Sequence, residues 1–216
     1  MARVGVGRGR VTPHPLWRPL VPAANAVRQG QRVAVRQVDR GPLREHDPGW
    51  AEDFARVARI VRHAISDQAL AVHHVGSTAV PGLRAKPIID VDLTVADVED
   101  EPSYLPQLEH AGFRLIFRDE MGGDPHRHLT FADPNTNLHV WSPGAVEPRR
   151  HLLFTAWLRS SAEDRDRYDE AKARAVAGSG EGRYNDLKAA VVHEIYDRAF
   201  AADLDESRPD RGPTPH

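Results

Sequence analysis

Apolar residues recur at helical spacing in the segment that begins near Trp50. Five of them fall on one face of a helix: Phe54, Val57, Ile60, Val61 and Ile65. This spacing predicts a helix over residues 50–66 that turns this face to the core.

Shorter apolar runs bounded by turn residues predict strands over 31–38, 70–75, 88–95, 113–118, 127–132 and 137–141. The last two form a hairpin around Asp133-Pro134-Asn135-Thr136. Further helices are predicted over 102–111, 148–160, 162–177 and 183–201. In the helix over 148–160, the residues expected to face inward are Leu152, Leu153, Ala156 and Trp157. Strands with interleaved helices, followed by a helical C-terminal third, indicate an α/β (or α+β) domain with helices packed behind or beside the sheet.

The chain has 216 residues, a formal net charge of −2 and no cysteine. So small a net charge makes nucleic acid an unlikely partner and does not favour an anionic membrane. The missing cysteines exclude disulfides, thiolate metal sites and cysteine nucleophiles. No apolar run approaches the roughly 20 residues that cross a bilayer, and the arginines and prolines in 1–31 argue against a signal peptide. We therefore expect a cytoplasmic protein with a poorly ordered leader over 1–31, a folded domain over 32–203 and a mobile tail over 204–216.

Two aspartates stand two residues apart in the predicted strand over 88–95. Since side chains alternate across a strand, Asp90 and Asp92 point to one face, while Val91, Leu93 and Val95 point to the other and enter the core. Two close carboxylates repel unless a cation lies between them. Magnesium takes hard oxygen ligands, commonly one or two carboxylates together with substrate phosphates. The pair therefore predicts a site for Mg²⁺ (or Mn²⁺) of the kind used in phosphoryl or nucleotidyl transfer.

A Gly-Ser step and two basic residues precede these aspartates. Gly76 lets the backbone approach a phosphate closely, and the Ser77 hydroxyl can hold a terminal phosphate oxygen. Arg84 and Lys86 are predicted to neutralise a triphosphate or the pyrophosphate leaving group. The Pro81-Gly82 turn would reverse the chain so that the serine and the aspartates converge.

The whole string from His74 to Asp90 resembles the GrpB family, whose members carry a similar His-x-Gly-Ser-Thr-x-Val-Pro-Gly-Leu-x-x-Lys-Pro-Ile-Ile-Asp run. The resemblance extends outward over about 33–202. It includes the segments 47–50 and 150–154 and two Tyr-x-x-x-Lys pairs, Tyr168 with Lys172 and Tyr184 with Lys188.

This resemblance implies a nucleotidyltransferase-like fold with a mixed sheet, and a family whose reaction is largely uncharacterised. A similar domain is fused to some dephospho-CoA kinases, which hints at a nucleotide-related setting. The chain departs from the family where many relatives have an Arg-Asp pair, since Thr155 and Ala156 stand there. Any role of that pair in substrate recognition cannot be carried over.

The sequence offers no obvious third carboxylate. In the hairpin, Leu129, Phe131, Leu138 and Val140 have the parity of core residues, so His128, Thr130, Asn137, His139 and Trp141 face the other way. If the aspartates share that face, His139 is the candidate third metal ligand or general base. The simpler reading is a partly buried polar residue, and the same alternatives hold for His126 and His128. His73 and His74 read as structural.

The lysines also have a functional and a structural interpretation. Only three occur in the chain: Lys86, Lys172 and Lys188. Lys188 is a candidate phosphate ligand. A lysine four residues after a tyrosine also commonly packs its aliphatic stem on the ring. Arg127 either binds a phosphate or is a solvated hairpin charge.

Two functions are compatible with these residues. The first is a metal-dependent nucleotidyltransferase that takes a nucleoside triphosphate and transfers its nucleotidyl group to an unidentified acceptor. In it Asp90, Asp92 and His139 serve as catalytic and metal-binding residues. The alternative is a non-catalytic nucleotide- or ligand-binding module that kept the fold.

Overall fold

A computed structural model of the chain describes residues 14–19, 30–177 and 181–206. The strands are β1 (Gly30–Arg32), β2 (Ala71–Val75), β3 (Ile89–Thr94), β4 (Arg114–Met121), β5 (Asp124–Phe131) and β6 (Thr136–Trp141). The helices are α1 (Gly49–Ile65), α2 (Glu101–His110), α3 (Val146–Ser160), α4 (Ala162–Ala177) and α5 (Glu181–Glu206). Two short 3-10 turns, η1 (Ser66–Gln68) and η2 (Ser77–Ala79), flank β2.

The strands form one six-stranded sheet in the order β1-β4-β5-β6-β3-β2. Only β3 and β6 run parallel; the other neighbours are antiparallel. The predicted mixed sheet, the packed helices and the helical C-terminal third are therefore confirmed.

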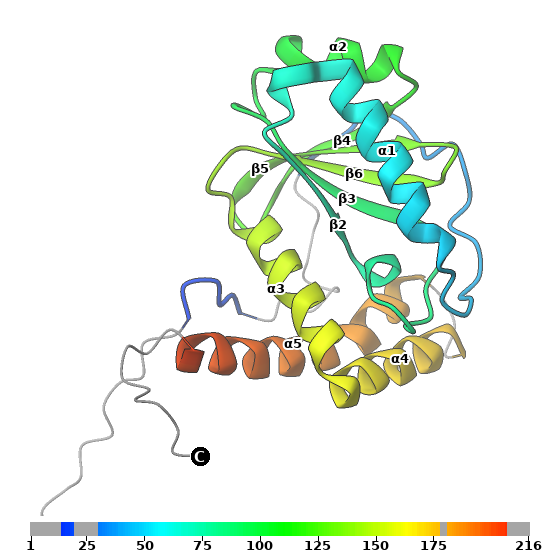
Figure 1. Cartoon of the computed structure of the whole chain (residues 1–216), viewed down its shortest axis with the longest axis vertical. Coiled ribbons are helices and arrows are strands. Elements are labelled where there is room, and N and C mark those ends of the chain that lie inside the picture. Colours follow the sequence, from blue (N-terminus) through cyan, green and yellow to red (C-terminus); the bar gives the residue numbers. More distant parts are fainter. Residues whose placement is uncertain (1–13, 20–29, 178–180, 207–216) are drawn as a thin grey trace, which may run out of the picture.

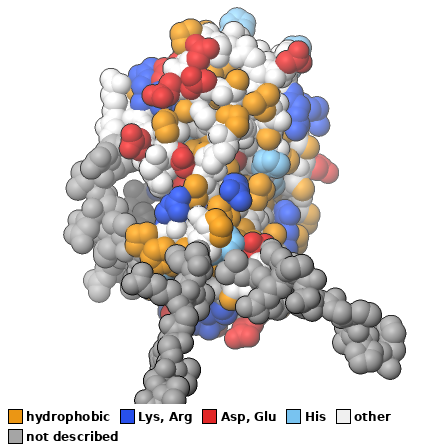
Figure 2. All heavy atoms as spheres, turned by 90° about the vertical axis from the view of Figure 1, so that its left-hand side faces the viewer, with side chains coloured by type: hydrophobic (Ala, Val, Ile, Leu, Met, Phe, Trp, Pro, Cys, Tyr) orange, Lys and Arg blue, Asp and Glu red, His pale blue; other side chains and the backbone are white. Residues whose placement is uncertain are grey.

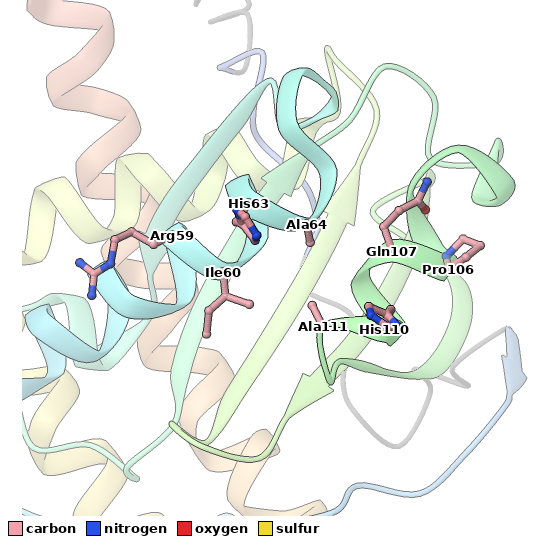
Figure 3. Close-up of a pocket in the computed structure, with 8 residues that line it drawn as sticks. All are labelled: Arg59, Ile60, His63, Ala64, Pro106, Gln107, His110 and Ala111. Carbon is pink, nitrogen blue, oxygen red and sulfur yellow. The ribbon is translucent and has the colours of Figure 1, made fainter.

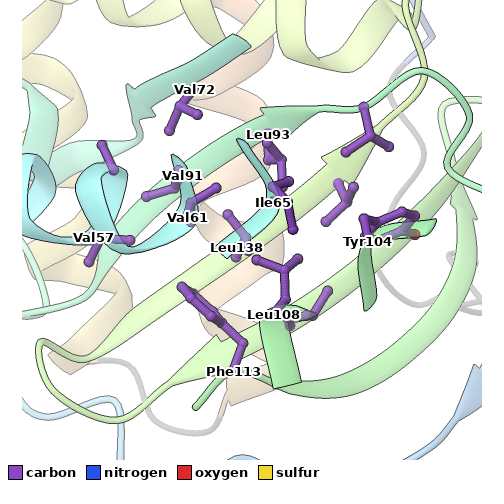
Figure 4. Close-up of a cluster of buried hydrophobic side chains, with 14 of the residues drawn as sticks. Val57, Val61, Ile65, Val72, Val91, Leu93, Tyr104, Leu108, Phe113 and Leu138 are labelled. Atoms are coloured by element: carbon purple, nitrogen blue, oxygen red, sulfur yellow. The ribbon is translucent and has the colours of Figure 1, made fainter. Parts of the chain in front are cut away.

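The hydrophobic core lies between one face of the sheet and the helices α1 and α2. Val57, Val61 and Ile65 of α1 face Val91 and Leu93 of β3, as Figure 4 shows. The predicted apolar face of the first helix and the inward parity of Val91, Leu93 and Val95 are both confirmed. A sheet buried on this face exposes its alternate side chains on the opposite face.

The helices α3, α4 and α5 form a second layer below the sheet in the view of Figure 1, at the end away from α2. They share a smaller core with the loop after β2, in which Leu158, Tyr168 and Ile195 pack on Val80 and Leu83. The cleft described below lies where this layer meets the sheet.

The structure corrects half of the predicted inward face of the helix over 148–160, since Leu153 and Trp157 pack against buried clusters as predicted. Leu152 and Ala156 are exposed, whereas Thr155 and Leu158 are buried. The reason is that α3 turns toward the polar face of the sheet, where its half-buried His151 contacts β3. The buried residues of α3 are Pro148, Thr155 and Leu158.

Three boundaries also differ from the prediction. The first strand is only three residues long, and Val33 and Val35 after it are exposed. The last helix continues to Glu206, into the predicted tail. Within the predicted leader, His14 and Leu16 are buried, and Leu16 lies against Tyr196 and Phe200 of α5. The rest of the predicted leader through 29, and residues 207–216 of the tail, lie outside the described residues.

Leu138→Ala is expected to lower the free energy of unfolding by about 2–5 kcal/mol, because this wholly buried side chain of β6 would leave a cavity. The measurement is urea unfolding followed by circular dichroism. Leu152→Ala, the same substitution at a position 38% exposed, is the control and should change stability by about 0.5 kcal/mol or less. Equal losses in the two variants would contradict the observed packing.

Candidate active site

The two aspartates of β3 lie on the face of the sheet that meets the C-terminal helices. On the parallel neighbour β6, Asp90 is registered with Asn137 and Asp92 with His139. Registered residues share a face, so the predicted convergence of His139 with the aspartates on one face is confirmed.

Asp92 is the more buried of the pair, and both of its oxygens have partners. The indole N–H of Trp141 donates to Oδ1 at 2.9 Å, and His151 Nδ1 lies 2.8 Å from Oδ2. Burial by itself lowers the pKa of His151, but its hydrogen bond to Asp92 and the charges of Asp92, Glu147 and Asp90 outweigh this and raise it. The raised pKa favours the protonated imidazole, whose charge would compensate that of a carboxylate only 1% exposed.

Asp90 lies nearer the cleft and is held by Asn137, whose amide donates to Oδ1 at 2.7 Å. The Asn137 carbonyl oxygen in turn accepts from the Arg36 guanidinium and lies 3.1 Å from His128 Nε2. Burial raises the pKa of Asp90, while the Asn137 hydrogen bond and the charge of Lys188 oppose that shift. A cation near Asp90 would favour its ionised form.

Gly76 explains why the second oxygen of Asp90 is accessible. Its φ of +72° lies in the left-handed region, which favours glycine. A Cβ built there would lie 2.6 Å from Asp90 Oδ2. The absence of a side chain thus preserves a cradle beside this oxygen.

A short relay of hydrogen bonds holds the Gly-Ser turn against the start of β3. His74 Nε2 lies 3.0 Å from the Thr78 hydroxyl, which donates to the Ile88 carbonyl at 3.1 Å. The His74 ring also stacks on Phe54, and burial together with the charge of Arg159 lowers the pKa of His74 to about 4. His74 is therefore a neutral structural residue, as its sequence context indicated.

Two adjoining cavities of about 510 and 390 Å³ form the cleft. The residues that line both are Ser77, Asp90, Met121, His139 and Lys188. Asp90 therefore lies at their junction.

The larger cavity is rich in positive charge. In a chain with 29 lysines and arginines, all three of the lysines, Lys86, Lys172 and Lys188, line this one cavity, together with Arg40. A lysine ammonium is a compact, mobile point charge suited to phosphate oxygens. The smaller cavity has a different character, since Phe154, Tyr168 and Tyr196 contribute aromatic rings to it.

Lys172 is unusual because its side chain is only 2% exposed. Its ammonium donates to the Arg84 carbonyl, lies 3.7 Å from Asp169 Oδ1 and 4.9 Å from the centre of the Tyr168 ring. Burial lowers the pKa of Lys172 to about 7 despite the nearby carboxylate. An anion in the cavity would restore its charge.

Six of the eight residues predicted to form the site line the cleft: Gly76, Ser77, Lys86, Asp90, His139 and Lys188. Asp92 lies next to them, buried under His151. Arg84 is not brought to the cleft, because its guanidinium pairs with Asp169 at 2.6 Å. Arg127 pairs with Glu101 at 2.5 Å on the opposite side of the sheet from the cleft, so its hairpin charge is not solvated.

Three contributors were not singled out as site residues from the sequence: Asn137, His151 and Trp141. The register of β6 could have found Asn137 and Trp141, since both have the parity of the aspartates. No local signal identifies His151, which follows Asp92 by 59 residues. The side chain of Tyr184 lies outside the described residues, whereas Tyr168 is buried with the Lys172 and Lys188 ammonium groups over its ring.

A divalent cation fits beside Asp90 by the chemistry of the donors and by the space that Gly76 leaves. Asp90 Oδ2 would hold it, with substrate phosphates completing the coordination, as Mg²⁺ commonly requires. Asp92 is a poorer donor, because both of its oxygens already accept hydrogen bonds. Within 14–19, 30–177 and 181–206, no three His, Asp or Glu side chains stand ready as a preformed metal site.

A third depression, of about 820 Å³, lies between α1 and α2 on the core side of the sheet (Figure 3). Its lining includes Arg59, His63 and His110 but no carboxylate. It is separate from the cleft.

Among the described helices, none is long and apolar enough to cross a membrane.

Comparison with known proteins identifies one matching family model and several relatives. A family model described as GrpB protein matches residues 42–198. A UPF0157 protein of Halalkalibacterium halodurans is 44% identical over 74% of this chain and 82% of its own length. A UPF0157 protein of Streptomyces coelicolor is 37% identical over 74% of this chain and 84% of its own.

The chain is also 33% identical to a dephospho-CoA kinase of Mycolicibacterium paratuberculosis, over 78% of this chain but only about half (48%) of the kinase. Among solved structures, the conserved protein GrpB from Enterococcus faecalis superposes with a TM-score of 0.64 at 27% identity. That match covers 76% of this chain and 99% of the other. A chain of the GLD-2/RNP-8 complex gives a TM-score of 0.48 at 14% identity. That match covers 80% of this chain and 74% of the chain in the complex.

Gly76→Ala is expected to weaken ligand binding in the cleft at least tenfold, because its Cβ would displace Asp90 Oδ2. Gly82→Ala is a matched control: Gly82 also has a positive φ, of +77°, but a Cβ there meets nothing within 4 Å. Calorimetric titration with nucleoside triphosphate and Mg²⁺ measures the difference. If both variants bind equally well, the cradle has no role.

The buried Lys172 predicts a specific pH dependence of stability. Its pKa is about 7 in the folded protein and ordinarily 10.5, so the unfolded chain binds one more proton between these values. The free energy of unfolding therefore rises with pH in this window, by up to about 1.4 kcal/mol per pH unit. Below pH 7 the contribution of Lys172 to it does not change with pH.

Lys172→Met should lack this slope. Urea unfolding of the wild type and of Lys172→Met between pH 6 and 9.5 isolates the slope due to Lys172, because all other titrating groups are the same in the two proteins. Parallel profiles would show that Lys172 stays charged in the folded protein.

Proposed function

Because the chain belongs to the GrpB family, as its match over 42–198 shows, we propose that it is a metal-dependent nucleotidyltransferase. It would bind a nucleoside triphosphate with Mg²⁺ (or Mn²⁺) and transfer the nucleotidyl group to an acceptor that is not yet identified. The observation that carries this proposal is the gathering of all three lysines around one cavity that opens on Asp90.

The charge of the cavity favours a polyphosphate over a single anion. Lys86, Lys172 and Lys188, with Arg40, surround about 510 Å³, a volume that accommodates a triphosphate with its bound cation. The Ser77 hydroxyl would bind a terminal phosphate oxygen. Lys172 would regain its charge when the phosphates enter, so binding would take up a proton near neutral pH.

The transfer step follows from where Asp90 lies. An acceptor hydroxyl in the smaller cavity would lose its proton to solvent and its oxygen would attack the α-phosphorus, while the bond from that phosphorus to the bridging oxygen of the β-phosphate would break. Pyrophosphate would then leave into the lysine-lined cavity. The cation would polarise the phosphoryl oxygens and offset their charge. Asp90 would hold it, with Asp92 and His139 as further candidate ligands.

A nucleic-acid acceptor is not favoured. The formal net charge is −2, and Figure 2 shows acidic and basic side chains interspersed over the visible face, with no stripe of one sign. The acceptor hydroxyl would instead belong to a small molecule that enters the aromatic cavity of about 390 Å³.

The alternative is a nucleotide-binding module without transferase activity. One observation favours it: Trp141 and His151 already occupy both oxygens of Asp92. In that case nucleotide would bind and no pyrophosphate would be released with any acceptor. A coupled pyrophosphate assay against an acceptor panel distinguishes the two functions.

Asp90→Asn should reduce metal-dependent nucleotide affinity by a factor of ten or more, about 1.4 kcal/mol, because the charge that holds the cation is lost. Calorimetry with a panel of nucleoside triphosphates, with and without Mg²⁺ or Mn²⁺, gives the affinities. Asp133→Asn, at a hairpin carboxylate that is 83% exposed and lines neither cavity of the cleft, is the matched control. Unchanged binding in Asp90→Asn would remove Asp90 from the site.

A further inference from the structure

A line of buried polar side chains runs across the sheet from β4 to β6. His126 Nδ1 lies 2.7 Å from Asp119 Oδ1, and His126 Nε2 lies 3.0 Å from His139 Nδ1. The side chains of Asp119 and His126 are 2% and 0% exposed. Only His139 of the three lines the cleft.

When both imidazoles are neutral, this arrangement determines where the protons lie. A carboxylate only accepts hydrogen bonds, so His126 Nδ1 carries a proton and donates it to Asp119. In a neutral imidazole the other nitrogen is an acceptor, so His126 Nε2 accepts from His139 Nδ1. A neutral His139 then carries its lone pair on Nε2.

Stacked neighbouring rings also fix the orientation of the His139 ring. The His128 ring stacks on it at 4.7 Å with an interplanar angle of 15°, and the His126 ring lies 5.1 Å away at 21°. His128 is itself held by Asn137, the residue that binds Asp90. The same strands thus orient His139 and the carboxylate together.

We propose that Asp119 and His126 are positioning residues that fix His139 as the tautomer protonated on Nδ1, so that its Nε2 lone pair serves as a ligand for a divalent cation in the cleft. A histidine that ligates a metal commonly donates its other N–H to a carboxylate or a polar group that fixes the tautomer. Here a second histidine stands between the ligand and the carboxylate. The cation part of this inference rests on the proposed function; the tautomer part does not.

The tautomer is tested first, by NMR of the metal-free full chain labelled with ¹⁵N at histidine. The His139→Gln spectrum identifies the signals of His139. In the wild type, Nδ1 should carry the proton and Nε2 should show the shift of an unprotonated nitrogen. In Asp119→Asn this pattern should be lost, because the amide can donate to His126 and reverse the order of protons. A proton on His139 Nε2 in the wild type, or an unchanged pattern in the variant, overturns the inference.

The cation role is tested with Mn²⁺ and a nucleoside triphosphate, because an imidazole ligand suits Mn²⁺ better than Mg²⁺. Electron paramagnetic resonance measures free Mn²⁺. Asp119→Asn and His126→Gln should each weaken Mn²⁺ binding about 10–100-fold. Thr130→Val, an isosteric change at a buried residue on the same face of β5, should leave it unchanged.

Equal Mn²⁺ affinity in the wild type and the relay variants overturns the cation role of His139 while leaving nucleotide binding at Asp90 intact. Absence of any Mn²⁺ binding to the wild type overturns that role and the proposed function together. In both cases the tautomer in the metal-free protein decides the positioning role separately.

Discussion

On β3, Val91 and Leu93 are wholly buried against α1, while Asp90 and Asp92 emerge on the opposite face. Because side chains alternate along a strand, these two facts are one constraint: a slip of one residue would bury both carboxylates in the core. The parallel pairing with β6 carries the same register to His139, which lies beside Asp92. Burial of apolar residues on one face thus places the chemistry on the other.

The polar face needs its own stabilisation, because α3 covers part of it. Asp92 lies between β6 and α3, and it is satisfied from both: by the Trp141 indole and by His151. An uncompensated carboxylate at this depth would cost several kcal/mol. The pKa of His151 is raised by its hydrogen bond to Asp92 and by the nearby carboxylate charges, which favours a positive charge beside Asp92. His151 consequently ties the helical layer to the sheet at the edge of the cleft.

The sequence allowed good prediction of elements and motifs that depend on local periodicity. The α1 face, the two faces of β3 and the hairpin of β5 and β6 follow from periods of 3.6 and 2, and the structure has them all. The inward face of α3 was predicted only in part, because its amphipathicity is weak and its neighbours are polar: His151 and Thr155 face inward while Leu152 is exposed. Tertiary contacts decided the orientation there. The same reason removed Arg84 from the cleft, since its partner Asp169 lies 85 residues away.

The charges of Asp90 and Lys172 are coupled to what binds in the cleft. Burial raises the pKa of Asp90 and lowers that of Lys172, so without a ligand burial disfavours the charged form of both groups at the places where charge would be used. A polyphosphate entering with a cation would reverse both penalties: the cation stabilises the Asp90 carboxylate, and the phosphates stabilise the lysine ammonium. Either partner alone would relieve only one of them. Under the proposed function, this coupling would favour a metal–nucleotide complex over a free metal ion or a free anion, since the lysines and the carboxylate line a single cavity.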